Sequence, residues 1–150
     1  MGDHGEMLGE HGEATHGLLP FAGARRVPLL LAGPGVPAGA VDDCLVRTVD
    51  VAPTLLALAG VDPPPGIDGD ALLPLPSRAD SCRRQSYTES FLPFFAYKWY
   101  PLRTLSAGNW LFLQGPRQSL FQLDRERGEE NDLAASEAGR TAAWSERLTA

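Results

Sequence analysis

Short segments that mix apolar and polar residues predict a small sheet in the second half of the chain. The four segments span residues 85–90, 102–106, 110–114 and 119–123. A Gly-Asn pair at 108–109 and a Gly-Pro pair at 115–116 separate the last three, and such pairs suit turns between antiparallel strands. The following segment, 134–148, has Trp144 and Leu148 four positions apart, which predicts a surface helix.

The first half shows a different pattern, an apolar run followed by a helical repeat. Residues 27–32 are almost wholly apolar and end at a Gly-Pro-Gly turn, so they predict a buried strand. Residues 51–59 repeat apolar side chains at helical spacing, with Asp50 as the expected N-cap and Gly60 as the end. We expect this helix to pack on a sheet. Residues 18–25 predict a short helical turn.

The charge balance narrows the classes of partner. The 150 residues include 13 Lys or Arg and 19 Asp or Glu, which gives a net charge of −6. A nucleic-acid-binding domain normally carries a basic patch, so we expect no nucleic-acid partner. No apolar run of the sequence reaches the roughly 18 residues of a membrane-spanning helix.

Candidate chemistry gathers in the first 17 residues. These residues hold all the histidines of the chain and four carboxylates: His4, His11, His16, Asp3, Glu6, Glu10 and Glu13. Carboxylate oxygens suit hard cations such as Ca²⁺ and Mg²⁺, while imidazole favours Zn²⁺ or Mn²⁺. An Asp-His pair in a Gly-rich loop could instead be turn chemistry, with the carboxylate bonded to its own backbone. The composition of this loop does not by itself name a reaction.

Ordered motifs around this pair extend the pattern through nearly the whole chain. They are DHGE (3–6), LGEHG (8–12), THG (15–17), RVPL (26–29), AGPG (32–35), DVAPTLL (50–56), GIDGDALLP (66–74), YTES (87–90) and LFQLD (120–124). In this order and spacing they resemble the C-terminal half of the sulfatases, which belong to the alkaline-phosphatase superfamily. Several ordered motifs together are far more specific than any one of them alone.

The resemblance implies a role for three of the N-terminal residues. In sulfatases a strand ends in Asp-His or Asp-Asn, whose side chains bind the catalytic metal ion, and Asp3 and His4 fall at that place. A Lys or His further along contacts the sulfate or phosphate oxygens, and His16 falls there. The expected cofactor is one divalent ion, Ca²⁺ first, with Mg²⁺, Mn²⁺ and Zn²⁺ as alternatives. His11 and Glu6 carry over no ligand role, and we expect them to orient the residues that do.

Two further parts that the family needs do not occur in this sequence. One is an earlier Asp-Asp pair for the same metal. The other is an upstream nucleophile, either a formylglycine made within a Cys-x-Pro-x-Arg motif or a plain Ser or Thr. Neither Cys44 nor Cys82 has a proline two residues on. We therefore expect this chain to be the carboxy-terminal part of a longer enzyme, inactive alone, whose missing N-terminal half is its partner.

The resemblance also implies a fold and a substrate class. The expected fold is α/β: a partial, alkaline-phosphatase-like doubly wound sheet in residues 1–76, then a small antiparallel C-terminal subdomain with a packing helix in residues 77–150. The expected substrate is a small-molecule or glycan sulfate ester. The same site with a plain Ser or Thr nucleophile performs phosphoryl transfer. A phosphodiesterase or phosphonate monoester hydrolase of the superfamily therefore stays open, as does a non-catalytic truncated fragment.

One aromatic stretch allows two interpretations. Residues 91–100, FLPFFAYKWY, hold six of the twelve aromatic residues. They could fill a core or pack two domains together, because aromatic side chains bury large apolar areas. They could also form a wall of the substrate cleft or a contact with the missing N-terminal half.

Overall fold

The chain forms two compact units in a computed structural model that describes residues 1–73, 83–123 and 128–149. One unit combines Met1–Pro28 with Gln85–Ala150, and the other is Leu29–Arg84. The first unit therefore joins the N-terminal loop to the sheet from the second half of the sequence. The predicted domain boundary at residues 76 and 77 lies outside the described residues, and the division into 1–76 and 77–150 stays a prediction.

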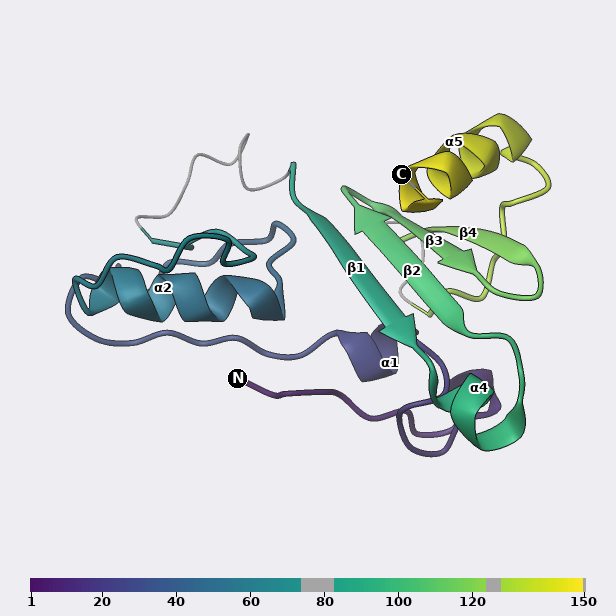
Figure 1. Ribbon diagram of the computed structural model, residues 1–150, viewed down its shortest axis with the longest axis horizontal. Coiled ribbons are helices and arrows are strands. Elements are labelled where there is room, and N and C mark those ends of the chain that lie inside the picture. The colour runs from purple at the N-terminus through teal and green to yellow at the C-terminus, as the bar shows by residue number, and fades with distance from the viewer. Residues whose placement is uncertain (74–82, 124–127, 150) are drawn as a thin grey trace. The chain divides into compact units, whose positions relative to one another are not determined.

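A four-stranded antiparallel sheet is the framework of the first unit. Its strands are β1 (Gln85–Ser90), β2 (Leu102–Ala107), β3 (Trp110–Gln114) and β4 (Gln118–Gln122), and they lie side by side in sequence order (Figure 1). The β2–β3 register pairs Ala107 with Trp110 across the predicted Gly-Asn turn. The four predicted strands are confirmed, each to within one residue at either end.

The two faces of this sheet are buried by different parts of the chain. Successive side chains of a strand point to opposite faces. Leu105, Phe112 and Leu120 stand opposite one another across β2, β3 and β4 and pack with Trp144. Leu111 and Phe121 are paired on the other face and pack with Met7 and Phe21 from the N-terminal segment, in a cluster that also includes Leu102 and Leu113.

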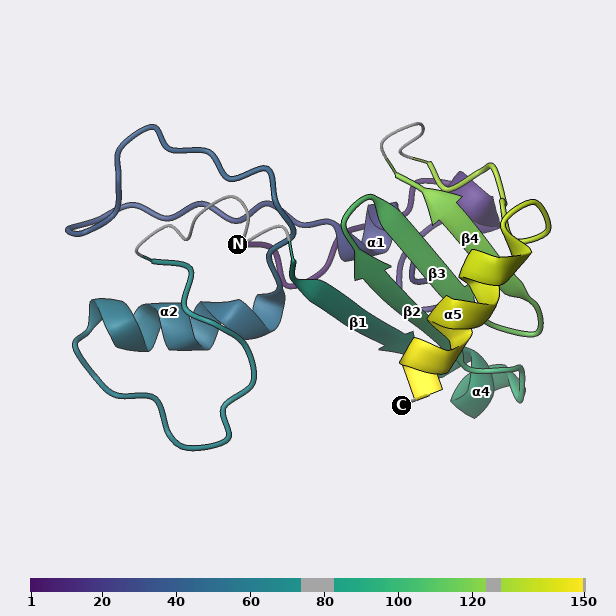
Figure 2. The same cartoon turned by 90° about the horizontal axis from the view of Figure 1, so that it is seen from above.

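Helix α5 (Ala138–Thr149) covers the first of these faces (Figure 2). Trp144 is only 6% exposed, and Leu148 packs beside it one turn later, so the predicted pair anchors the helix. The helix begins at Ala138 and not at residue 134. Before the helix, the Asp132 carboxylate accepts hydrogen bonds from the backbone N–H groups of Leu120 and Ala134. Burial alone would raise the pKa of Asp132, but these donors bring it below the usual value.

The second unit contains helix α2 (Val51–Leu58), preceded by the 3₁₀ turn η2 (Thr48–Asp50). Gly60 ends the helix as predicted, with φ 67°. The Val61 N–H bonds the Leu56 carbonyl and the Gly60 N–H bonds the Ala57 carbonyl, a Schellman motif.

Two expectations about this second unit are wrong. Asp50 does not cap the helix with its side chain. Its fully buried carboxylate instead accepts hydrogen bonds from the Arg47 guanidinium and the Asp70 N–H. The segment 27–32 forms no strand within the described residues, and Leu30 is 80% exposed. An apolar run indicates burial but does not supply the neighbouring strand that its backbone N–H and C=O groups need.

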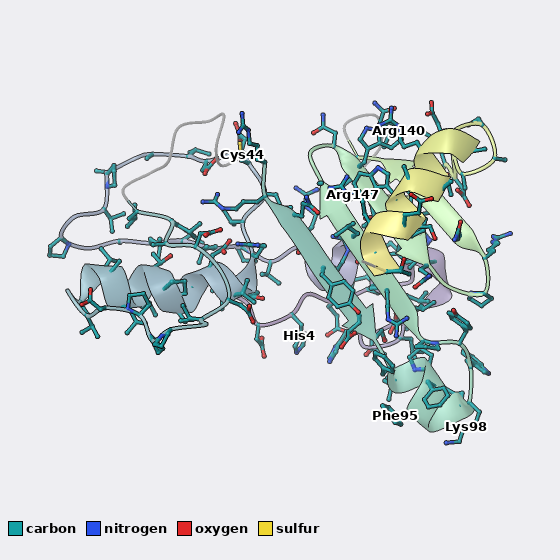
Figure 3. All side chains as sticks on the ribbon, turned by 45° about the horizontal axis from the view of Figure 1, so that its top comes forward. His4, Cys44, Phe95, Lys98, Arg140 and Arg147 are labelled. Atoms are coloured by element: carbon teal, nitrogen blue, oxygen red, sulfur yellow. The ribbon has the colours of Figure 1, made fainter. Side chains whose placement is uncertain are left out.

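The aromatic stretch forms helix α4 (Leu92–Tyr97) and the turn after it. Five of its six aromatic side chains are exposed: Phe94, Phe95, Tyr97, Trp99 and Tyr100. Phe95 and Lys98 project outward in Figure 3. The stretch therefore does not fill a core within the described part of this chain. Within that part, no helix combines the length and apolar character needed to cross a membrane.

The expected α/β class is confirmed, and so is the small antiparallel subdomain with its packing helix α5. The described residues 1–73 contain no strand, so the doubly wound sheet expected in residues 1–76, on which α2 would pack, is not formed there. The N-terminal segment with the candidate chemistry packs against the face opposite α5 through Met7 and Phe21. The sheet therefore supports the loop in which the three histidines lie.

Candidate functional site

Two backbone contacts fold the N-terminal loop back on itself. The Met7 N–H donates to the Thr15 carbonyl at 2.8 Å, and the Gly9 N–H donates to the Glu13 carbonyl at 2.9 Å. Between them lies η1 (Glu10–Gly12), a 3₁₀ turn in which His11 has φ 52°. Pairing Met7 with Thr15 brings His16 beside residues 4–6, although twelve positions separate His16 from His4.

His4, Glu6 and His16 form one exposed cluster. One ligand atom from each residue lies within 4.8 Å of the others. The imidazole rings of His4 and His16 stack with their centroids 3.9 Å apart and their planes 27° apart. His16 Nδ1 is 3.1 Å from Glu6 Oε1. An ionised carboxylate can only accept, so this contact puts the proton on Nδ1 and leaves His16 Nε2 free to meet a ligand.

The tautomer of His4 follows from its own hydrogen bond. His4 Nδ1 lies 2.9 Å from the Gly5 carbonyl oxygen, and because a carbonyl can only accept, Nδ1 carries the proton. His4 Nε2 therefore presents its lone pair, and it lies 3.8 Å from Asp3 Oδ2. Figure 3 shows His4 on the N-terminal segment. The side chain of His4 is 49% exposed.

Hydrogen bonds and nearby charges shift the pKa values of Asp3 and His4. The Gly5 carbonyl raises the pKa of His4 because it favours the protonated ring. Desolvation opposes this shift, and the carboxylates of Asp3 and Glu6 add to it. The backbone N–H groups of Asp3 and His4 lower the pKa of Asp3, and the positive charge of His4 lowers it further. A deprotonated Asp3 is therefore available as a ligand across the neutral range.

The donor atoms of Asp3 and His4 fit a shared divalent cation. Oxygen and nitrogen ligands lie about 2.0–2.6 Å from such ions. Two donors on one ion are therefore about 3–4 Å apart, and the two atoms here are 3.8 Å apart. Both side chains reach solvent, so an ion could enter without moving the core.

The structure brings the three predicted site residues into one loop, places Glu6 where it can orient His16 and separates His11 from them. Glu6 contacts His16 directly, and no sequence signal marked this pair, which is ten positions apart. His11 lies outside the cluster. Its ring stacks on Phe21 with centroids 3.8 Å apart, and its Nε2 lies 2.7 Å from the Gly128 carbonyl oxygen.

Helix α1 (Ala22–Arg25) packs against the backbone of the loop that carries the cluster. The Gly5 N–H donates to the Ala24 carbonyl at 2.9 Å. A Cβ on Gly5 would lie 2.0 Å from the Gly23 carbonyl oxygen, and a Cβ on Gly23 would lie 2.6 Å from Met7 Sδ. Two glycines therefore let residues 4–7 lie directly on the helix.

No cysteine of the described residues can act as a free nucleophile. Cys44 takes part in a disulfide, and a thiol must be free and ionised to attack a substrate.

Comparisons with known proteins identify the family. The family model described as the C-terminal part of N-sulphoglucosamine sulphohydrolase matches residues 9–104. This range includes His11 and His16 but begins after Asp3 and His4. The choline-sulfatase of Rhizobium meliloti (strain 1021) is 34% identical over 145 residues, which cover 91% of this chain and 27% of that protein.

Solved structures share the fold. A protein in complex with its substrate D-glucosamine-2-N,6-O-disulfate matches with a TM-score of 0.78 and 22% identity, over 97% of this chain and 32% of that one. The phosphonate monoester hydrolase of Silicibacter pomeroyi matches with a TM-score of 0.76 and 23% identity, over 98% and 32%.

The chain is short beside its relatives. It spans between 8% and 27% of the length of the curated proteins that match it first. The matched residues of the family model nevertheless cover well over half of this chain. The chain belongs to the sulfatase family and corresponds to its C-terminal part.

Proposed function

We propose that this chain carries part of the metal and substrate site of a hydrolase that cleaves sulfuric esters. Asp3 and His4 are the ligands of one divalent ion, Ca²⁺ first, with Mg²⁺, Mn²⁺ and Zn²⁺ as alternatives. His16 contacts the sulfate oxygens. The nucleophile and the other metal ligands come from a part of the enzyme outside these residues.

The proposal rests on the position of His4, which lies beside both the proposed metal ligand Asp3 and the proposed sulfate-binding residue His16. Its Nε2 lone pair lies 3.8 Å from Asp3 Oδ2, and its ring stacks on His16 at 3.9 Å. A cation held by Asp3 and His4 would therefore lie beside the imidazole of His16. A sulfate ester presents several partly negative oxygens, so a cation and an N–H donor side by side suit it.

Each residue then has a separate task. Asp3 supplies negative charge to the ion, and His4 supplies a neutral nitrogen ligand whose tautomer the Gly5 carbonyl fixes. Glu6 accepts the Nδ1–H of His16, so that Nε2 faces the ligand, and in the imidazolium form of the ring Nε2–H donates to a sulfate oxygen. When bound, the ion would supply Lewis-acid polarisation of the ester oxygens. Electrostatic stabilisation of this kind is commonly the largest contribution that a hydrolytic site makes.

The proposed substrate is a sulfated sugar or another small sulfate ester. One structural neighbour is described in complex with a disulfated glucosamine, and the matching family model is described by a sulphoglucosamine substrate. Both support a sugar as the alcohol part of the ester. A phosphonate or phosphodiester substrate is the second candidate, which the likeness to a phosphonate monoester hydrolase favours.

The test uses the protein of the full reading frame that contains this sequence, loaded in turn with Ca²⁺, Mg²⁺ or Mn²⁺. Hydrolysis of a nitrophenyl sulfate is compared with that of a nitrophenyl phosphodiester. We expect turnover of the sulfate and a loss of roughly 100-fold or more in Asp3→Ala and His4→Ala, because even residues that only orient metal ligands contribute 10–100-fold. We expect a loss of about 10²–10³ in His16→Ala, as for other removed oxyanion donors, and less in His16→Lys.

The outcomes separate the candidates. Cleavage of the phosphodiester alone moves the substrate class to the second candidate. No cleavage of either substrate, or full activity in Asp3→Ala and His4→Ala, contradicts the proposed metal roles and favours a non-catalytic protein. The matched control is Glu146→Gln, which changes an exposed carboxylate on α5 and should keep full activity.

A further inference from the structure

The segment after β4 reaches back to the N-terminal loop across more than 100 sequence positions. Glu129 is only 2% exposed, and its carboxylate accepts hydrogen bonds from the Ala22 N–H at 3.0 Å and from Arg25 Nη2 at 2.7 Å. The neighbouring Gly128 carbonyl accepts one from His11 Nε2 at 2.7 Å. Two adjacent residues thus bind two separate parts of the N-terminal segment.

The Glu129 contacts fix helix α1. The Ala22 N–H is the first free amide of that helix, and Glu129 gives it an acceptor that the sequence before it does not. The Arg25 guanidinium is further held by the Pro20 carbonyl at 2.7 Å and by Ser106 Oγ at 3.4 Å on β2. Removing the charge of Glu129 would leave Arg25 buried without its counter-ion.

Helix α1 in turn sets the position of His4 and Glu6. Its Ala24 carbonyl accepts the N–H of Gly5, the residue between them. A Cβ on Gly5 would meet the Gly23 carbonyl oxygen, and a Cβ on Gly23 would meet Met7 Sδ. A shift of α1 therefore moves the backbone that carries the side chains of His4 and Glu6.

The His11 contacts fix the other side of the cluster. The ring stacks on Phe21, just before α1, and its Nε2–H donates to the Gly128 carbonyl. His11 lies in the turn enclosed by the Met7–Thr15 backbone contact, and His16 directly follows that contact. Both His11 and Glu129 have φ 52°, a conformation that residues other than glycine keep only where surrounding contacts hold it.

We propose that Glu129 and His11 are positioning residues, which act through α1 and η1 to hold His4, Glu6 and His16 in one cluster. The inference rests on the proposed function only in treating that cluster as the functional site. It gives the third histidine of the loop a structural task, since its Nε2 is bonded to a carbonyl oxygen.

The experiment measures the cluster itself in the 150-residue chain, without added metal. The readout is the nuclear Overhauser effect between the imidazole protons of His4 and His16, whose rings stack in the native protein. The variants are Glu129→Gln and His11→Asn. Asparagine tolerates a positive φ but is too short to reach the Gly128 carbonyl, so this variant separates the lost contact from backbone strain. Glu146→Gln is the matched control.

We expect the signal to fall to less than half in both variants and to stay unchanged in the control. The signals between Trp144 and Phe112, on the opposite face of the sheet, should stay unchanged in all of them. An unchanged His4–His16 signal in His11→Asn and Glu129→Gln overturns the inference. The inference is also overturned if the Trp144–Phe112 signals are lost together with the His4–His16 signal, because the variant would then affect folding in general. If Glu129→Gln does not fold, His11→Asn decides alone.

This readout is independent of the proposed function. If the histidine signal changes as expected but metal and sulfate ester have no effect on the protein, the positioning role stands and the proposed function fails. If metal binds and the histidine signal does not change, the proposed function stands and the positioning role fails.

Discussion

Replacing Gly5 with alanine should damage the site and the fold together. The added Cβ would lie 2.0 Å from the Gly23 carbonyl oxygen and 3.3 Å from the Ala24 carbonyl oxygen. Carbon and oxygen atoms do not approach within 3.0 Å in such contacts, so residues 4–6 and α1 must separate by about 1 Å. The hydrogen bond between Gly5 N and the Ala24 carbonyl, now 2.9 Å, would then be lost.

The magnitude follows from these two effects. Overpacking a filled site costs about 1–3 kcal/mol, and a lost backbone hydrogen bond costs about 0.5–1.5 kcal/mol. Against this, alanine restricts the unfolded chain and returns about 0.4–1 kcal/mol. We expect the free energy of unfolding to fall by about 2–3 kcal/mol, and the ring contact between His4 and His16 to weaken.

The assay is urea unfolding followed by tryptophan fluorescence, with the histidine proton signals recorded in the folded protein. Gly139→Ala is the matched control, because nothing lies within 4 Å of a Cβ there and Gly139 is inside α5. It should stabilise the protein by up to about 0.5–1 kcal/mol. A change of less than about 0.5 kcal/mol in Gly5→Ala, with the histidine contact intact, would refute the close packing of residues 4–7 on α1.

Three further predictions concern the rest of the chain. Trp144→Ala should lower the free energy of unfolding by about 3–5 kcal/mol in urea, because Trp144 is 6% exposed; a loss below 1 kcal/mol would contradict its role. Gly60→Ala should cost about 1 kcal/mol at φ 67°, measured the same way. Burial would raise the pKa of Asp50, but Arg47 and the Asp70 N–H lower it overall. The protection of the Leu72 amide from exchange should therefore hold above pH 4 and fall below about pH 3.8. Asp50→Asn should remove that acid dependence.

The sign of the last prediction follows from linkage. A carboxyl whose pKa is lower in the folded than in the unfolded state stabilises the fold when it is ionised. That contribution is complete above the unfolded pKa and disappears as pH falls through the folded one. Leu72 reports on it because its N–H donates to Thr54 Oγ1, which itself donates to the Asp50 carbonyl.

The sheet could be predicted from the sequence because its signals are local. β1 and β3 begin and end as predicted, and the Gly-Asn pair fixes the register between β2 and β3. Trp144 and Leu148 gave the buried side of α5 for the same reason. The expected strand at 27–32 did not form among the described residues, because strand formation depends on a partner that no local pattern can reveal.

The candidate site was predictable only in part. The resemblance to sulfatases named Asp3, His4 and His16, and the structure brings them into one loop, but their roles in metal and substrate binding stay predictions. The contact between Glu6 and His16, and the contacts of Glu129 with α1, join residues far apart in sequence. Asp50 resembled a helix cap, but Arg47 and the Asp70 N–H hold its carboxylate instead. Side-chain contacts decided each of these, and residue propensities do not encode them.

The most direct test of the central claim is to locate the cation on this chain. Mn²⁺ is titrated into the uniformly labelled protein, and the paramagnetic broadening of each backbone amide signal is recorded, which detects even weak binding. We predict that broadening starts at Asp3, His4 and Gly5, is abolished in His4→Ala, and is kept in His11→Asn at reduced strength. Broadening that starts at another acidic group, such as Asp70, or that persists unchanged in His4→Ala, would contradict the assignment of the metal site.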